Sequence, residues 1–309
     1  MRQSQTITLL TDFGNQDAYV GIMKGVIAGI NPLANIIDIC HNTPPQDIFH
    51  GAYLLYTSYN YFPKGTIHVA VVDPGVGSRR DVVCVETQEH IFLVPDNGIL
   101  SFVVQKESPK GIFRVTNNRY FLPSPSNTFH GRDVFAPVAA HLSLGIKPRQ
   151  LGNKINKLEQ LDIPGPEYKE TGKLEGRIIY IDRFGNLVTN ITREHITQYI
   201  TNQSQLTTNR DKIPPSALPL RKGRYAKQSP AFPLLPGAEK MIRKYAIKTT
   251  IGKKKIRGLS KTYTDVKAGE PLVLLGSADF LEISINQGNA QKYFKMDRGK
   301  KIMVEIGAC

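Results

Sequence analysis

Strand-like and helix-like patterns alternate over the first 165 residues, and this alternation leaves few folds open. An apolar run at residues 7–13 is typical of a buried strand, and apolar residues at helical spacing follow it from Tyr19 to Ile30. Similar evidence predicts strands at 36–39, 66–72, 82–86 and 90–94, and helices at 47–56 and 134–144. We therefore predict a mainly parallel α/β sheet domain over residues 1–165, with its ligand loops at the strand ends.

The second half has a different pattern of predicted secondary structure. Strand-like segments recur without long helices, at 174–181, 187–191, 245–251, 271–275, 280–285 and 301–306. This pattern predicts a smaller all-β, barrel-like domain over residues 166–309, with Pro164-Gly165-Pro166 as the boundary. Six prolines among basic and polar residues indicate a Pro-rich basic insertion on the surface at about 203–237.

Positive charge is concentrated in the second half. Residues 1–200 carry 19 Lys and Arg against 18 Asp and Glu, whereas residues 201–309 carry 21 against 8, within a total of +14. Such a region attracts nucleic acid or acidic surfaces. However, the run Lys253-Lys254-Lys255-Ile256-Arg257 has no interleaved aromatic residues and fits a solvated hairpin equally well. We therefore do not expect nucleic-acid binding as the main function.

The sequence also bears on compartment. No apolar run approaches the roughly 20 residues that a membrane-spanning helix needs, and the apolar stretch at 7–10 is too short for a signal peptide. The three cysteines are far apart and match neither a disulfide framework nor a metal-ligand spacing. We expect a cytoplasmic protein without a membrane partner.

The first candidate site is the turn after the first strand, Thr11-Asp12-Phe13-Gly14, followed by Asp17 and Tyr19. Carboxylates at 12 and 17 at the end of a strand can bind ribose hydroxyls or an ammonium group. They can equally serve to cap the helix that follows. The spacing leaves both interpretations open.

The second candidate is the segment VDPGVGSRR at residues 72–80. Asp73 closes a strand, and the glycines permit a sharp return that aims Arg80 back toward it. The loop lacks a Walker lysine and does not match GxGxxG, so it does not indicate a phosphate cradle. A purely structural Asp–Arg turn is the alternative.

Two further segments carry polar and aromatic side chains. SNTFHGRDVF at 126–135 places His130 just before a helix. This segment does not indicate a metal site, because no second histidine follows at helical spacing. IDRFGNLVTNI at 181–191 places Phe184 beside a glycine and Asn186, which can stack on a purine and hydrogen-bond to its edge. The alternatives are a structural histidine in the first segment and an ordinary β-turn in the second.

These motifs occur together and in order, with PDNGIL at 95–100 and GSADFLEISINQGNA at 276–290. In this combination the chain resembles the S-adenosyl-L-methionine hydrolases (hydroxide adenosyltransferases), relatives of fluorinating and chlorinating enzymes that use the same substrate. The resemblance covers most of 6–200 and resumes around 256–291. The Pro-rich 203–237 segment lies outside the pattern.

The resemblance implies roles for individual residues. The catalytic set of the family falls on Asp73, Arg80 and His130. The implied substrate contacts are Asp12 for the ribose hydroxyls; Asp17, Tyr19, Asp182 and Ser277 around the methionine end; and Phe184, Asn186, Phe129 and the backbone near Ile285 and Gln287 around adenine. Tyr19 and Ala278 stand where the halogenating relatives use other side chains. The family also implies a homotrimer, with each site between the first domain of one subunit and the second domain of its neighbour.

The expected function is hydrolysis of S-adenosyl-L-methionine to adenosine and L-methionine, with no metal and no cofactor apart from this substrate. The first alternative is a halogenase that makes 5′-halo-5′-deoxyadenosine, but an ionised Asp73 would repel a halide. The second alternative is a nucleotide- or RNA-binding module without catalysis. Retention of Asp73, Arg80 and His130 favours an enzyme over this module.

Overall fold

The computed structural model describes residues 6–169, 172–208, 241–242 and 244–308. The chain divides into two compact units, Met1–Ile163 and Pro164–Cys309, and each is considered by itself. No helix in the described ranges is both long enough and apolar enough to cross a membrane.

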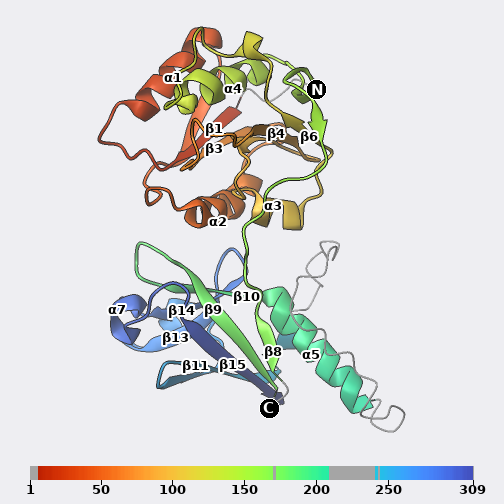
Figure 1. The fold of residues 1–309 in the computed structure, drawn as a ribbon. Helices are drawn as coiled ribbons and strands as arrows, with labels where there is room; N and C mark the ends of the chain where they lie inside the picture. Colours follow the sequence, from red (N-terminus) through yellow and green to blue (C-terminus); the bar gives the residue numbers. More distant parts are fainter. Residues whose placement is uncertain (1–5, 170–171, 209–240, 243, 309) are drawn as a thin grey trace. The chain divides into compact units, whose positions relative to one another are not determined.

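The first unit is a three-layer α/β structure (Figure 1). Its strands are β1 (Thr6–Thr11), β2 (Asn35–Cys40), β3 (Ile67–Val71), β4 (Val82–Glu86), β5 (Ile91–Pro95), β6 (Gly111–Arg114) and β7 (Lys154–Ile155). Its helices are α1 (Tyr19–Ile30), α2 (Ile48–Ser58), α3 (Ser101–Lys106) and α4 (Ala136–Ser143). Helices α1 and α4 cover one face of the sheet, and α2 and α3 cover the other.

The sheet of the first unit has the strand order β2-β1-β3-β5-β4-β6-β7. Strands β2, β1, β3 and β5 are parallel, whereas β4, β6 and β7 are added antiparallel. Every residue of β1, β3 and β5 is buried, as expected for strands covered by helices on both faces. In α1, Val20, Met23 and Ile27 share the buried face, which confirms the helix predicted from their spacing.

The predicted fold class is therefore confirmed for this half, with differences in detail. The short strands β6 and β7 were not predicted; each has at most four residues, which is too short for a clear alternation of apolar and polar residues. The helix expected at 134–144 starts earlier, as a π-helical turn over Gly131–Phe135 that continues into α4. Such turns are frequent at functional sites.

The second unit is an antiparallel, barrel-like sheet. Its strands are β8 (Glu167–Lys169), β9 (Lys173–Ile181), β10 (Leu187–Thr192), β11 (Tyr245–Ile251), β12 (Lys254–Arg257), β13 (Pro271–Leu275), β14 (Phe280–Ile285) and β15 (Lys301–Ala308). Their order is β12-β11-β15-β9-β10-β14-β13, with β8 paired to β9. An isolated bridge between Ser260 and Leu274 links the chain after β12 to β13 and nearly closes the barrel. The predicted all-β architecture is confirmed.

One expectation for this half is wrong. The second unit contains a long helix, α5 (Arg193–Thr208), as well as the short α7 (Ala290–Phe294). Ile196, Tyr199 and Ile200 of α5 belong to the core of the barrel, so tertiary packing supports a segment whose mean hydropathy is low. The insertion expected at 203–237 overlaps the end of α5, and its remainder from 209 lies outside the described residues.

Candidate active site

The first part of the site lies where the order of the parallel strands reverses direction. The chain runs from β1 outward to β2 and then returns to β3 on the other side of β1. Loops after β1 and β3 therefore diverge and leave space for a ligand at the carboxyl ends of these strands. Thr11 and Val71 are register partners, so Asp12 and Asp73 leave the sheet at this point.

Asp73 and Arg80 form a buried ion pair there. The loop between them is folded by Ser78, whose hydroxyl donates to the Gly75 carbonyl oxygen at 2.7 Å. Arg80 Nη2 then donates to Oδ2 of Asp73, while Nη1 donates to the Asp81 carbonyl oxygen at 2.7 Å. The side chains of Arg80 and Asp73 are only 10% and 5% exposed. The return predicted from the glycines is thus present.

His130 is brought to this pair by contact between two loops. Gly77 has φ +77° and its backbone lies against Asn127, so that a Cβ at Gly77 would come within 2.4 Å of the Asn127 carbonyl oxygen. His130 follows three residues later, at the start of the π-helical turn. Both Arg80 and Asp73 act electrostatically on the imidazole. The structure therefore gathers the three predicted catalytic side chains in one place.

Each member of this cluster keeps a polar atom buried without a hydrogen-bond partner among the described residues. These atoms are Oδ1 of Asp73, Nε of Arg80 and Nδ1 of His130. Native proteins seldom leave buried polar groups unsatisfied, so three in one cluster call for an explanation. A small polar ligand held between them would supply the missing partners.

The environment shifts the pKa values in a direction that suits proton acceptance. Burial raises the pKa of Asp73, against the opposing effects of Arg80, the Gly75 backbone and His130. Burial lowers the pKa of His130, and the Arg80 charge lowers it further, against the effects of Asp73 and Asp133. At neutral pH the imidazole is therefore uncharged.

Asp12 and three aromatic rings line the neighbouring loops. Asp12 Oδ2 accepts a hydrogen bond from the Gln46 backbone at 2.8 Å. Neither Asp12 nor Asp17 caps α1, because Ala18 is its N-cap and no side chain caps it. Phe129 lies 5.9 Å from Phe13 and 5.0 Å from Tyr19 between ring centroids. The rings thus connect the loop after β1 to the loop of His130, while Asp17 and Tyr19 are exposed.

In the second unit, Asp182 organises the turn that presents Phe184. Asp182 Oδ1 accepts from the backbone N–H groups of Phe184 and Asn186, both at 2.9 Å. Its Oδ2 accepts from Asn186 Nδ2 at 2.8 Å. Phe184 is 73% exposed despite its size, whereas Asn186 is buried. A turn is thus present in this segment, with Gly185 N donating to the Asp182 carbonyl oxygen at 3.0 Å, and the exposed ring leaves a purine contact open to Phe184.

The end of β14 lies beside this turn. Leu187 pairs with Ile283 in antiparallel register, so the residues before Leu187 approach those after Ile283. Gln291 N donates to the Gly185 carbonyl oxygen at 2.9 Å, which fixes the start of α7 to the turn. The predicted contacts near Ile285 and Gln287 therefore lie at the same end of the sheet as Asn186. Ile285 is buried and Gln287, with φ +53°, is exposed.

Ser277 lies in the turn at the opposite end of β14, next to Gly276, whose backbone approaches the buried Glu282. Glu282, buried within β14, accepts a hydrogen bond from Tyr263 at 2.8 Å. A Cβ at Gly276 would lie 3.1 Å from its other carboxylate oxygen. Burial, the bond to Glu282, and the charges of Glu282 and Asp182 all raise the pKa of Tyr263. The sequence analysis missed Tyr263 and Glu282; an acid inside an apolar strand was the available signal.

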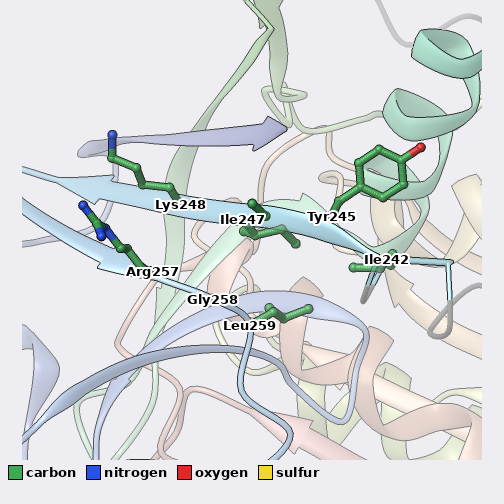
Figure 2. A pocket seen from close by; sticks show the side chains of 8 residues that line it. Ile242, Tyr245, Ile247, Lys248, Arg257, Gly258 and Leu259 are labelled. Atoms are coloured by element: carbon green, nitrogen blue, oxygen red, sulfur yellow. The ribbon is translucent and has the colours of Figure 1, made fainter. Parts of the chain in front are cut away.

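A separate groove occurs elsewhere on the second unit, between β11 and the chain after β12 (Figure 2). Its apolar part is lined by Ile242, Tyr245, Ile247 and Leu259, with Lys248 and Arg257 at one end. None of the predicted site residues lines it. Within the described residues, no group of three or more His, Cys, Asp or Glu side chains is placed to hold a metal ion.

An α/β unit with a charged cluster at its switch point, followed by a β-barrel unit, matches one family throughout. The SAM hydroxide adenosyltransferase N-terminal domain model matches residues 7–152, and the corresponding C-terminal domain model matches 176–227 and 236–303. The chain belongs to this family. Because the second match extends to residue 227, most of the segment 203–237 lies within the family pattern, which corrects our expectation of an insertion outside it.

Individual relatives of the chain include members of the same family. A protein of Methanocaldococcus jannaschii named (R)-S-adenosyl-L-methionine hydrolase is 44% identical over 196 residues, covering 62% of this chain and 68% of the relative. A fluorinase of Actinoplanes sp. is 27% identical over 241 residues, covering 69% and 81%. The crystal structure of an uncharacterized conserved protein from Thermotoga maritima has a TM-score of 0.78 and 31% identity, covering 97% and 99%.

Proposed function

We propose that this enzyme hydrolyses S-adenosyl-L-methionine to adenosine and L-methionine. The observation that carries the proposal is the buried cluster of Asp73, Arg80 and His130, each with an unpartnered polar atom, in a chain of the hydroxide adenosyltransferase family. A water molecule is the ligand that suits these atoms, because it can donate to an acceptor and accept from a donor at once.

In the proposed reaction the water oxygen forms a bond to C5′ of the ribose as the C5′–sulfur bond breaks. The bonding pair goes to the positively charged sulfur, so methionine leaves as a neutral thioether and needs no acid. One proton of the water is left over. Asp73 and His130 accept it between them, since the ion pair with Arg80 favours the ionised form of Asp73 and the lowered pKa of His130 keeps the imidazole neutral at pH 7.

The nucleophile sets the energetic demand. Forming free hydroxide from water of pKa 15.7 at pH 7 costs about 12 kcal/mol. A single cation about 4 Å away in a partly screened site returns only roughly 4 kcal/mol. Arg80 alone therefore does not suffice. Proton acceptance during C–O bond formation, and alignment of water, C5′ and sulfur in a site from which bulk water is excluded, supply the remainder.

The halogenating alternative differs in its nucleophile. A halide carries no proton, so a site for it has no use for a base, and the ionised carboxylate of Asp73 would repel it. Burial raises the pKa of Asp73, but the paired Arg80 opposes that shift and favours the ionised form at pH 7. Water is therefore the favoured nucleophile, although fluorinases are among the relatives.

Substrate contacts are proposed on both units. Asp12 holds the ribose hydroxyls, and Phe129 lines the pocket beside them. Phe184 and Asn186, with the backbone near Ile285 and Gln287, contact adenine. Asp17, Tyr19, Asp182 and Ser277 surround the amino and carboxylate groups of methionine. We further propose a cytoplasmic homotrimer in which one subunit's first unit and its neighbour's second unit complete each site, with no cofactor besides the substrate.

A labelling experiment tests the reaction. The purified protein is incubated with S-adenosyl-L-methionine in water enriched in oxygen-18, with and without chloride or fluoride, and the products are separated by chromatography and weighed by mass spectrometry. Adenosine with oxygen-18 at the 5′ position is the expected product. A 5′-halogenated nucleoside would establish the alternative nucleophile, and unchanged substrate would contradict both enzymatic proposals.

A further inference from the structure

We propose that one end of the second unit is a binding surface for single-stranded nucleic acid, separate from the proposed hydrolase activity. This hairpin surface is formed by the turn and second strand of the β11–β12 hairpin together with α7 and the residue that ends it (Figure 1). Its members are Lys253, Lys254, Lys255, Arg257, Tyr293 and Lys295, and all six are exposed.

The cations of this surface are unpaired, whereas those on neighbouring strands are neutralised. Lys248 of β11 contacts Glu305 at 3.2 Å, and Lys301 of β15 contacts Glu175 at 2.7 Å. In contrast, none of the five cations of the hairpin surface forms an ion pair with any described residue. Uncompensated like charges gathered in one place create a positive potential that attracts polyanions.

The fold supplies the aromatic rings that the basic run lacks in sequence. Lys254 Nζ lies 3.5 Å from the centroid of the Tyr293 ring and 5.7 Å from that of Phe294. The hairpin turn itself touches the end of α7, because a Cβ at Gly252 would lie 3.0 Å from Cε of Met296. Tyr293 remains 43% exposed, while Phe294 is buried beneath it. An exposed ring among lysines is therefore built into the surface.

This combination favours single-stranded nucleic acid over other polyanions. Lys253, Lys254 and Lys295 line one hollow together with Tyr293. Strand alternation turns Lys255 and Arg257, about 7 Å apart along β12, to the opposite face of this edge strand. Figure 2 shows Arg257 beside its cross-strand partner Lys248 on that face. Cations that follow a backbone, next to an aromatic ring on which a base can stack, are the recurrent design of single-strand binding sites.

A membrane surface fits less well. Peripheral membrane binding needs an apolar face beside the basic one. Among the described residues of the hairpin and α7, Tyr293 is the one large hydrophobic side chain that is exposed. The described residues of the hairpin and α7 therefore form no apolar ridge that could insert into a membrane. The favoured partner is single-stranded RNA or DNA, because both carry the phosphates and bases that this surface can bind.

The test measures fluorescence anisotropy of labelled oligo(U) and oligo(dT) 12-mers with the full-length protein. Oligo(U) and oligo(dT) are measured separately because nothing in the proposed surface selects ribose over deoxyribose. If three phosphates are contacted, affinity should fall about 20-fold between 50 and 200 mM salt. The variant Lys253→Glu/Lys295→Glu changes the two exposed lysines that line the hollow with Tyr293. It should bind at least about tenfold more weakly, as two phosphate contacts are lost and two repulsive charges are added.

The control is Lys154→Glu/Lys157→Glu, which makes the same change of net charge on two exposed lysines of the first unit. It should change the affinity less than about twofold at 200 mM salt, where remote charges are screened. Equal losses in the two double variants would show attraction by total charge alone and overturn the proposal. So would a failure of the wild-type protein to bind either oligonucleotide, or binding only to vesicles that contain phosphatidylserine.

A second variant separates stacking from charge. Tyr293→Ala should weaken single-strand binding about fivefold or more without changing the salt dependence, because a stacked base contributes roughly 1–3 kcal/mol. An unchanged affinity would remove the aromatic element and with it the preference for nucleic acid. Thermal unfolding and adenosine formation by all variants should match the wild type, which keeps this outcome independent of the hydrolase proposal.

Discussion

The backbone of Gly77 lies against the carbonyl oxygen of Asn127, and this contact holds the loop of Asp73 and Arg80 to the loop of His130. A Cβ at Gly77 would come within 2.4 Å of that oxygen. The positive φ of +77° adds a second penalty for any side chain. The separation of the catalytic groups therefore depends on the absence of a side chain at one position.

The first prediction is that Gly77→Ala lowers turnover by about tenfold or more, because displaced catalytic groups lose the alignment that the reaction needs. Gly299→Ala is the matched control, since Gly299 has φ +87° but open space around it. Both variants should lose about 1 kcal/mol of stability from backbone strain, and Gly77→Ala should lose more because of its clash with Asn127. Steady-state kinetics and urea unfolding measure the two effects. Equal kinetics in both variants would show that the loop contact does not matter.

The second prediction separates catalysis from stability at the buried ion pair. Asp73→Ala should lower kcat by at least about a hundredfold with little change in KM, as expected for loss of a base. It should also destabilise the protein, since Arg80 is left buried and unpaired. The double variant Asp73→Ala/Arg80→Met should recover thermal stability but not turnover. Near-native turnover in Asp73→Ala or Arg80→Ala would refute the catalytic assignment.

The third prediction concerns the pH dependence of kcat/KM. Turnover needs Asp73 ionised and His130 neutral, and both conditions fail as the pH falls. The pKa of His130 is lowered from 6.5 and that of Asp73 is raised from 3.8, so the acid limb should report whichever of the two groups is protonated first as the pH falls. Activity should change little from pH 8 down to about 7. A loss of activity that begins well above pH 7 would contradict at least one of the two assigned protonation states.

The fourth prediction concerns stability and a second buried cluster, on β3 and β5 of the first unit. His68 is fully buried and accepts or donates a hydrogen bond with Thr8 at 2.8 Å. Burial, with a smaller effect of His90, lowers the pKa of His68 from 6.5 to about 3. Below pH 6.5 the unfolded chain therefore binds a proton that the folded chain does not, and stability decreases as the pH falls toward 3.

Between pH 6.5 and 4.5 the loss attributable to His68 is roughly 2 kcal/mol. The variant His68→Phe/Thr8→Val replaces both hydrogen-bond partners by apolar groups and should show a smaller loss of stability over the same range. Urea unfolding at the two pH values measures it. The half-buried His195 of the second unit, whose pKa is lowered by desolvation to about 4, stays in place and preserves part of the effect. An unchanged pH dependence would exclude His68 as the source.

The first half could be predicted well because its signals are local. The buried strand before Asp12, the glycine-rich return to Arg80 and the apolar spacing of α1 each follow from neighbouring residues. The strands β6 and β7 and the π-helical turn at Gly131 could not, because pairing with distant strands and packing against Met23 and Phe13 decide them. Helix α5 was missed because three buried apolar residues support it within a polar segment.

The site was recovered unevenly for the same reason. The glycines between Asp73 and Arg80 allowed the approach of these two residues to be anticipated, whereas the place of His130 in the catalytic set was implied only by the family resemblance. Tyr263 and Glu282 carry no motif and come together only through the tertiary fold: Ser260, near Tyr263, bridges to Leu274, which pairs with Glu282. Asp182 illustrates the reverse case: the family resemblance implied a substrate contact, and the structure adds three hydrogen bonds that hold its own turn.

The fifth prediction tests whether each site is shared between subunits of the proposed trimer. Asp73→Ala inactivates the first unit's part of the site, and Phe184→Ala/Asn186→Ala impairs the second unit's part. In a closed ring of head-to-tail contacts, random mixing of equal amounts gives about one quarter of the sites two intact halves. Activity of the mixture after joint refolding should therefore recover to about a quarter of wild type.

If both halves came from one chain, every site would contain a defective half and no activity would return. Light scattering of the mixture verifies that the oligomer has reformed, so an inactive but assembled mixture would contradict the shared site.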